Sequence, residues 1–157
     1  MHTFAPVSSC RHTTLEIATE HRTQFVDLTE RIETFIAGEG FQAGLVNIQS
    51  RHTTTAIIVN EHEPLLLSDF ASLLARAVPR HALYRHDDMR QRTVNLTPEE
   101  RENGFSHCRA LLLGAAVCLN VTDGRLQLGR WQRVFLVELD GPRDREVSVL
   151  LLGDVGR

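Results

Sequence analysis

The sequence contains no lysine, so all 17 of its basic residues are arginine. A Schiff base with a carbonyl substrate or with pyridoxal phosphate needs a lysine amine, and that chemistry is therefore excluded. A phosphate-binding loop of the Walker type also depends on a lysine and is excluded too. Any binding of phosphate groups must rely on arginine side chains, backbone amides or a metal ion.

The sequence also has few cysteines, no long apolar run and no excess of positive charge. The three cysteines are odd in number and scattered, so we expect reduced thiols in the core and no disulfide framework: Cys10, Cys108 and Cys118. No apolar run approaches the roughly 20 residues of a membrane span, and residues 1–10 lack the pattern of a signal peptide. The net charge of −3 gives no basic footprint for nucleic acid. We expect a cytoplasmic protein that binds neither nucleic acid nor membrane.

The first half of the chain shows alternating strand and helix patterns. Strands are predicted from alternating or β-branched side chains, and helices from capping residues followed by an apolar stripe. The predicted elements are a strand at 11–19, a helix from Asp27 to Gly38, strands at 44–49 and 53–60, and a helix from Pro64 to Pro79.

The second half begins with a long polar stretch. Residues 80–106 are poor in aliphatic side chains and predict a functional or mobile loop. From His107 onward, short apolar runs separated by glycine turns predict strands alone. Because strands and helices do not alternate strictly, we expect one α+β domain over residues 1–157, with two helices packed on a mixed, largely antiparallel, sandwich-like β-sheet.

Three histidines stand at the ends of predicted elements: His52, His86 and His107. A catalytic zinc site commonly takes three protein ligands from different elements and keeps a fourth position open. These histidines belong to no short metal motif, and the alternative for each is an exposed or hydrogen-bonded imidazole. If the three rings converge on one polar pocket, they can hold a divalent metal such as zinc.

Other polar residues admit two interpretations each. Glu61 ends the strand at 53–60 and is either a helix-start charge or a general base. Asp87 and Asp88 either orient His86 or solvate a loop. Trp131 and Gln132 suit the stacking and hydrogen bonding of a small heteroaromatic ring, while a core tryptophan is the alternative.

Several segments, in the correct order, resemble the YjbQ-like family, also called the secondary thiamine-phosphate synthase family. They are RHTTTA at 51–56, VNE at 59–61, VP at 78–79, YRH at 84–86, His107 with LLG at 112–114, VTDGRLQLGRWQ at 121–132 and ELDGPRDR at 138–145. The resemblance spans roughly residues 10 to 153. The chain departs from the family pattern before His107 and at Arg109, Leu111 and Arg130, which indicates a divergent subgroup.

The resemblance implies a YjbQ-like fold, a homotrimer, and a pocket of histidines that in some members holds a metal such as zinc. The implied reaction is secondary thiamine-phosphate synthesis, in which the nitrogen of a thiazole phosphate displaces diphosphate from a hydroxymethylpyrimidine diphosphate. The metal ligands would be His52, His86 and His107. The catalytic residues would be His52, Glu61, Trp131 and Gln132. The arginines that contact phosphate would come from Arg51, Arg85, Arg109 and Arg130.

Two other functions fit the same residues. One is a metal-dependent hydrolase of a phosphoester or an amide, with Glu61 as the base. The other is a non-catalytic trimer that binds a small phosphorylated heterocycle. Ligand binding without turnover would distinguish the second from either enzyme.

Overall fold

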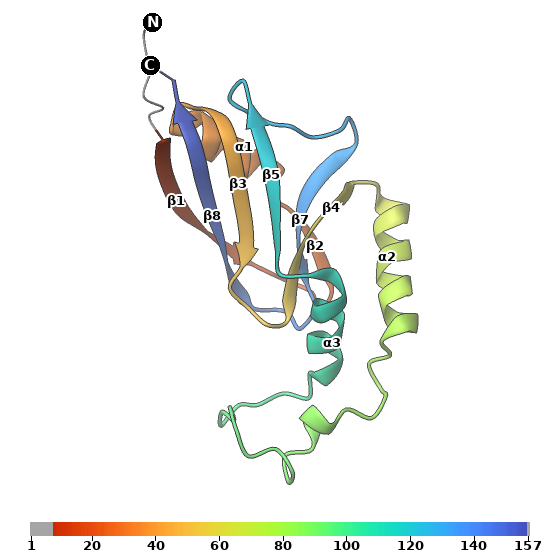
Figure 1. The fold of residues 1–157 in the computed structure, drawn as a ribbon. Coiled ribbons are helices and arrows are strands. Elements are labelled where there is room, and N and C mark those ends of the chain that lie inside the picture. The colour runs from red at the N-terminus through yellow and green to blue at the C-terminus, as the bar shows by residue number, and fades with distance from the viewer. Residues whose placement is uncertain (1–7, 157) are drawn as a thin grey trace, which may run out of the picture.

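The computed structural model describes residues 8–156, in which two antiparallel sheets are combined with three α-helices (Figure 1). The strands are β1 (Ser8–Ala18), β2 (Gln24–Asp27), β3 (Phe41–Ser50), β4 (Thr55–Glu61), β5 (Ala116–Thr122), β6 (Arg125–Leu126), β7 (Gln132–Glu138) and β8 (Asp144–Val155). The helices are α1 (Thr29–Gly38), α2 (Pro64–Ala77) and α3 (Gly104–Leu113), with a 3₁₀ turn η1 (Arg85–Asp87). This arrangement confirms the predicted α+β class.

The larger sheet has the strand order β1-β8-β3-β5-β6, and the smaller one has the order β2-β7-β4. Every pair of neighbouring strands is antiparallel. Side chains alternate between faces along β8, so Val147, Val149 and Leu151 are fully buried while Leu152 is exposed. The main core lies where buried side chains of both sheets meet those of α1.

Helix α1 is held in the core by its apolar stripe. Leu28, Ile32 and Ile36 have no exposed surface and pack in the main core. The Oδ1 atom of Asp27 accepts a hydrogen bond from the backbone N–H of Thr29 (2.9 Å). The N-cap residue is Leu28 and not Asp27, so the helix begins one residue later than predicted. The helix ends before Gly40, whose φ of +61° is a backbone conformation that favours glycine.

Helix α2 is well capped but poorly buried. The carboxylate of Glu63 accepts hydrogen bonds from the backbone N–H groups of Leu65 and Leu66, and Pro64 opens the helix as predicted. Of its apolar stripe only Leu74 is buried, while Leu65 and Leu73 are exposed. Figure 1 shows α2 standing at the side of the smaller sheet.

The prediction of strands alone from His107 onward is wrong, because this histidine lies in helix α3. Phe105, Arg109 and Ala110 are buried. Arg109 follows Phe105 by four residues and Ala110 follows Arg109 directly, so the three lie on the face of the helix that points to the protein interior. The described part of the chain, residues 8–156, therefore contains three α-helices and not two. The strands predicted after residue 114 are confirmed as β5 to β8.

Two further expectations about burial are wrong. All three cysteines are exposed, so none is a core thiol: Cys10, Cys108 and Cys118. Trp131 is 61% exposed, which rules out the alternative of a core tryptophan. None of the helices within residues 8–156 is long and apolar enough to cross a membrane.

Candidate functional site

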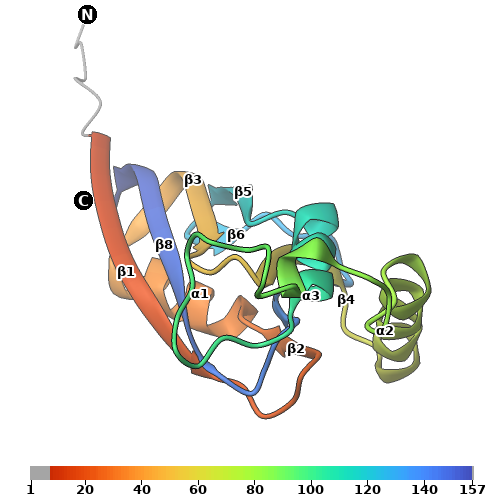
Figure 2. The ribbon, with the colours of Figure 1, turned by 90° about the horizontal axis from the view of Figure 1, so that it is seen from below.

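The three predicted histidines line one pocket of about 660 Å³ at the end of the molecule where α3 begins. His52 comes from the turn between β3 and β4, His86 from η1, and His107 from α3. Seen from below, the segment between η1 and α3 crosses this end of the molecule (Figure 2). Elements that are distant in sequence thus surround one polar space.

His86 and His107 lie against each other, with ring centroids 4.6 Å apart in an edge-on arrangement. Burial lowers the pKa of His107, and the neighbouring His86 lowers it further. The Nε2 atom of His86 is buried and has no hydrogen-bond partner among the described residues. His107 is therefore neutral over more of the physiological pH range, and His86 offers one buried ring nitrogen that can bind a ligand.

His52 is fixed by backbone contacts. Its backbone N–H donates to the hydroxyl of Ser50 (3.1 Å), and its Nε2 atom accepts a hydrogen bond from the backbone N–H of Glu146 (2.7 Å). Burial lowers the pKa of His52, and the positive charge of Arg145 adds to this effect. Because Nε2 acts as an acceptor, the proton of the neutral ring resides on Nδ1.

The donor atoms of the three histidines are not gathered around one point in this structure. Among residues 8–156, no three His, Cys, Asp or Glu side chains have their donor atoms gathered closely enough to hold a metal ion. His86 and His107 are adjacent, but the Nε2 atom of His52 is already occupied by the Glu146 N–H. A metal at these histidines therefore stays a prediction.

The wall of the pocket beneath His52 contains a buried ion pair. Arg145 donates from Nε and Nη2 to the two carboxylate oxygens of Glu138, both at 2.6 Å, and from Nη2 to the hydroxyl of Thr54 (3.1 Å). Burial alone would raise the pKa of Glu138, but the hydrogen bonds from Arg145 and from the backbone N–H of Asp140 outweigh it and lower the pKa. This pair holds the start of β4 and the end of β7 in place.

Five arginines line the pocket, and four of them are paired with carboxylates. The lining arginines are Arg51, Arg92, Arg101, Arg143 and Arg145. Arg51 pairs with Glu146 and Arg92 with Glu100, while Arg143 pairs with Asp140 and Arg145 with Glu138. Arg101 has no carboxylate within ion-pair distance in the part of the chain that is described, and its Nη1 donates only to the backbone oxygen of Asp140 (3.5 Å). Arg101 is thus the guanidinium most available to an anion.

Of the arginines predicted to contact phosphate, the structure brings only Arg51 to the pocket. Arg109 is buried, donates from Nε and Nη2 to the backbone oxygen of Val78, and lies over the ring of Phe105. Its role is to hold α3 against the end of α2. Arg85 lies in η1 but is not among the pocket-lining residues.

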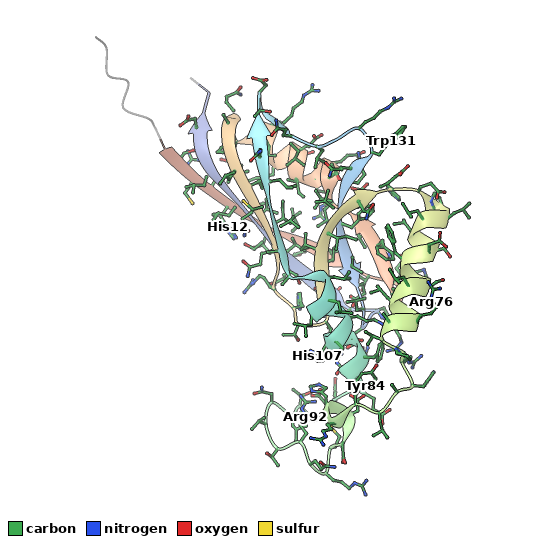
Figure 3. All side chains as sticks on the ribbon, turned by 45° about the vertical axis from the view of Figure 1, so that its right-hand side comes forward. His12, Arg76, Tyr84, Arg92, His107 and Trp131 are labelled. Carbon is green, nitrogen blue, oxygen red and sulfur yellow. The ribbon has the colours of Figure 1, made fainter. Side chains whose placement is uncertain are left out.

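The remaining predicted residues lie at the opposite end of β4. Glu61 closes this strand and pairs with Gln132, whereas His52 precedes its first residue. Seven residues of extended chain span roughly 20 Å, and Figure 3 shows Trp131 and His107 at opposite ends of the molecule. Arg130 stacks on the exposed ring of Trp131 there. Within one chain, these residues form a group separate from the histidines.

Several pocket residues carry no local motif and were not predicted: Arg92, Arg101, Asn103, Asp140, Arg143 and Arg145. The first three lie in the long polar stretch that was predicted as a loop. The last three lie in the ELDGPRDR segment, where the density of charge next to a buried strand is the signal that could have identified them.

Comparisons with known proteins agree on one family. Residues 13–154 match the family described as UPF0047 protein YjbQ-like. A UPF0047 protein of Methanothermobacter thermautotrophicus is 37% identical over 139 residues, covering 88% of this chain and 90% of that protein. One of Archaeoglobus fulgidus is 36% identical, with coverages of 88% and 98%.

Solved structures of similar proteins show the same fold. A YbjQ-like protein of unknown function from Sulfolobus solfataricus has a TM-score of 0.84 at 30% identity and covers 94% of this chain and 99% of its own. A conserved hypothetical protein from Thermus thermophilus has a TM-score of 0.70 at 36% identity, with coverages of 88% and 98%.

Proposed function

This chain belongs to the YjbQ-like UPF0047 family, and from that premise we propose that its pocket binds a small phosphorylated heterocycle as a transferase of the secondary thiamine-phosphate synthase type. The observation that carries the proposal is a pocket in which three histidines stand beside Arg101, an arginine that has no carboxylate partner among residues 8–156. A guanidinium binds phosphate oxygens through paired N–H donors. Imidazoles supply and accept protons near neutral pH.

In the proposed reaction, a thiazole-phosphate nitrogen attacks the methylene carbon of the pyrimidine diphosphate. The new C–N bond forms as the C–O bond to diphosphate breaks, and the diphosphate leaves with the bonding electrons. Arg101 and Arg51 would bind the departing phosphate oxygens. His86 and His107 would donate hydrogen bonds to them, since both rings face the same space.

A divalent metal such as zinc remains a prediction. His86 and His107 are the adjacent donors in the structure, so they are the residues expected to bind it. Elemental analysis of protein purified without a chelator or a histidine tag tests this expectation. Stoichiometric zinc that is lost in His86→Ala would support it, and metal-free wild-type protein would contradict it.

The experiment that tests the transferase proposal supplies the two thiamine precursors to purified protein and measures thiamine phosphate. We expect product from wild-type protein and at least about a tenfold lower rate from His107→Asn, because the shorter amide removes the imidazole that contacts the leaving group. His12→Asn, at an exposed position on β1, is the matched control and should keep the wild-type rate. Equal rates for all three proteins would contradict the proposal.

A hydrolase with Glu61 as the base finds less support within a single chain. Glu61 lies at the far end of β4 from the histidines, so it could act on this pocket only from a second copy of the protein. Generic phosphoesters and amides test this function, and Glu61→Gln should abolish turnover if it is correct. A non-catalytic binder would instead show thermal stabilisation by the precursors without product.

We also propose that the protein is a homotrimer, as the family resemblance implies. If Glu61, Trp131 and Gln132 take part in the reaction, they must do so at the pocket of a neighbouring chain, because their own pocket is at the other end of the molecule. Light scattering coupled to size-exclusion chromatography measures the assembly directly. A mass of one chain would contradict it.

A further inference from the structure

Two oxygen atoms of pocket-lining side chains have no hydrogen-bond donor among residues 8–156. They are Oδ1 of Asn103 and Oδ1 of Asp140, and both atoms are buried. The Asn103 side chain donates from Nδ2 to the other carboxylate oxygen of Asp140 (3.0 Å). That bond fixes the orientation of the amide, so the free atom of Asn103 is an oxygen and not an N–H group.

Both residues are buried, and the backbone of each is held by a hydrogen bond. Asn103 is 6% exposed and Asp140 is fully buried. The backbone N–H of Asn103 donates to Asp87, while the backbone N–H of Asp140 donates to Glu138. A buried acceptor without a donor is unfavourable, and native proteins seldom keep one unless a ligand or water satisfies it.

The charges around the two oxygens favour a hydrogen-bond donor over a metal cation. Arg143 donates from Nη2 to Oδ2 of Asp140 (2.9 Å), and Nη1 of Arg22 lies 3.5 Å from its Oδ1. The contact with Arg22 is within ion-pair range but too long for a good hydrogen bond. Two guanidinium groups thus balance the carboxylate and would repel a further cation, while Oδ1 can still accept a hydrogen bond.

We propose that Asn103 and Asp140 form an acceptor subsite that recognises an exocyclic amino group on a heteroaromatic ligand. A planar amino group presents two N–H donors, which match one amide oxygen and one carboxylate oxygen on adjacent side chains. The proposal rests on the proposed function, in which Arg101 and Arg51 bind the phosphate portion of the same ligand. It adds that Asn103 and Asp140 recognise the ring portion of the ligand through hydrogen bonds.

This subsite would determine specificity between similar rings. A site built from buried acceptors discriminates strongly against an analogue that lacks the donor, because the acceptors are then left unpaired. A ring with hydrogen in place of the amino group should therefore bind weakly even when its phosphate contacts are intact.

The test compares two unphosphorylated probes on the full-length protein by ligand-observed NMR or calorimetry. The probes are 4-amino-5-hydroxymethyl-2-methylpyrimidine and its counterpart with hydrogen at position 4. We expect the amino compound to bind at least about tenfold more tightly. Equal affinities, or no binding of the amino compound, would overturn the proposal, and both outcomes are read from wild-type protein alone.

Two variants locate the effect. Asn103→Ala should bring the two affinities to within about twofold of each other, because the amide acceptor is removed and Asp140 loses a partner. Asn95→Gly is the matched control, since Asn95 also lines the pocket and its φ of +53° suits glycine. This control should keep the full preference for the amino compound, and a control that lost it would place the subsite elsewhere.

Inorganic pyrophosphate separates this inference from the proposed function. Its binding reports only on the arginine contacts. Pyrophosphate that binds while the two rings show equal affinity would leave the proposed function intact and refute the subsite. Discrimination between the rings without pyrophosphate binding would support the subsite and contradict the phosphate contacts of the proposed function.

Discussion

At the residue scale, the ion pair of Glu138 and Arg145 is the most deeply buried charge contact near the pocket. Their side chains are 0% and 4% exposed. Glu138 accepts hydrogen bonds from Arg145, the hydroxyl of Thr19 and two backbone N–H groups, so every lone-pair direction of the carboxylate is used. Removing one partner of such a pair strongly lowers the free energy of unfolding, because the other charge is then left buried and unpaired.

We expect Glu138→Gln to lower the free energy of unfolding at pH 7 by about 3 kcal/mol or more, because the Arg145 charge is left buried without a partner. The folded-state pKa of Glu138 is below its ordinary value of 4.5, so the stability it contributes is present above pH 4.5 and is lost as pH falls through the folded-state pKa. Urea titrations at several pH values measure both effects.

The difference between wild type and Glu138→Gln should shrink below pH 4.5, and a difference that stayed constant would contradict this assignment. Glu16→Gln, on the exposed face of β1, is the control and should change stability by less than about 0.5 kcal/mol. The double replacement Glu138→Leu with Arg145→Met should cost less than Glu138→Gln alone, because no buried charge remains.

Arg101 offers a test of anion binding at a single side chain. We expect Arg101→Gln to weaken pyrophosphate binding about tenfold or more, since it removes a guanidinium without a carboxylate partner among residues 8–156. Arg85→Gln is the matched control, because Arg85 is near in sequence but outside the pocket lining. Calorimetry at low and moderate salt measures both, and an equal loss in the two variants would contradict a specific role for Arg101.

At the scale of elements, the start of a helix could be predicted where the residues that cap it are adjacent to it in the sequence. Helix α2 begins with its own cap, Glu63, and a proline, so its start could be predicted from adjacent residues. Helix α3 has no side-chain cap of its own. Its first N–H groups are bound by Asp87, which lies 16 residues before Asn103. A contact of that range cannot be deduced from sequence pattern, and a buried arginine at 109 also hides the apolar stripe.

The strand predicted at 53–60 is observed as β4, Thr55–Glu61. Since His52 precedes this strand and Glu61 closes it, the two ends had to be far apart. The histidines could be grouped because the sequence predicts each of them at a junction between elements, although His107 lies inside α3. The arginines and acidic residues of the pocket depend instead on how the loops fold over it.

We expect Asp87→Ala to destabilise the start of α3 by about 1 to 2 kcal/mol, because one carboxylate oxygen caps both Asn103 and Gly104. The amides of residues 103–107 should then exchange hydrogen faster, as measured by NMR. Asp88→Ala is the matched control, since Asp88 accepts from the backbone of Arg90 and not from α3. Unchanged exchange in Asp87→Ala would contradict the capping role.

At the scale of the whole molecule, apolar side chains remain exposed away from the pocket. Leu65 and Leu73 on α2, Leu111 and Leu112 on α3, and Trp131 are each more than half exposed. Large exposed apolar side chains are candidates for contacts between subunits. An assembly that covers these side chains also supplies the one means by which Trp131 and a histidine pocket can meet, because the two lie at opposite ends of one chain.

Mixing two inactive variants tests whether such shared sites exist. In a trimer made from equal amounts of His107→Ala and Trp131→Ala chains, every chain lacks one residue, so a site confined to one chain stays inactive. If Trp131 acts at the neighbouring pocket, about a quarter of the sites combine an intact pocket with an intact tryptophan. We therefore expect co-refolding to restore about a quarter of the wild-type rate of thiamine phosphate formation.

Mixing His107→Ala with His86→Ala is the matched control and should restore nothing, because both imidazoles belong to the same pocket of the same chain. Mixed trimers that recovered no activity in the first experiment would show that Trp131 does not serve a neighbour's site.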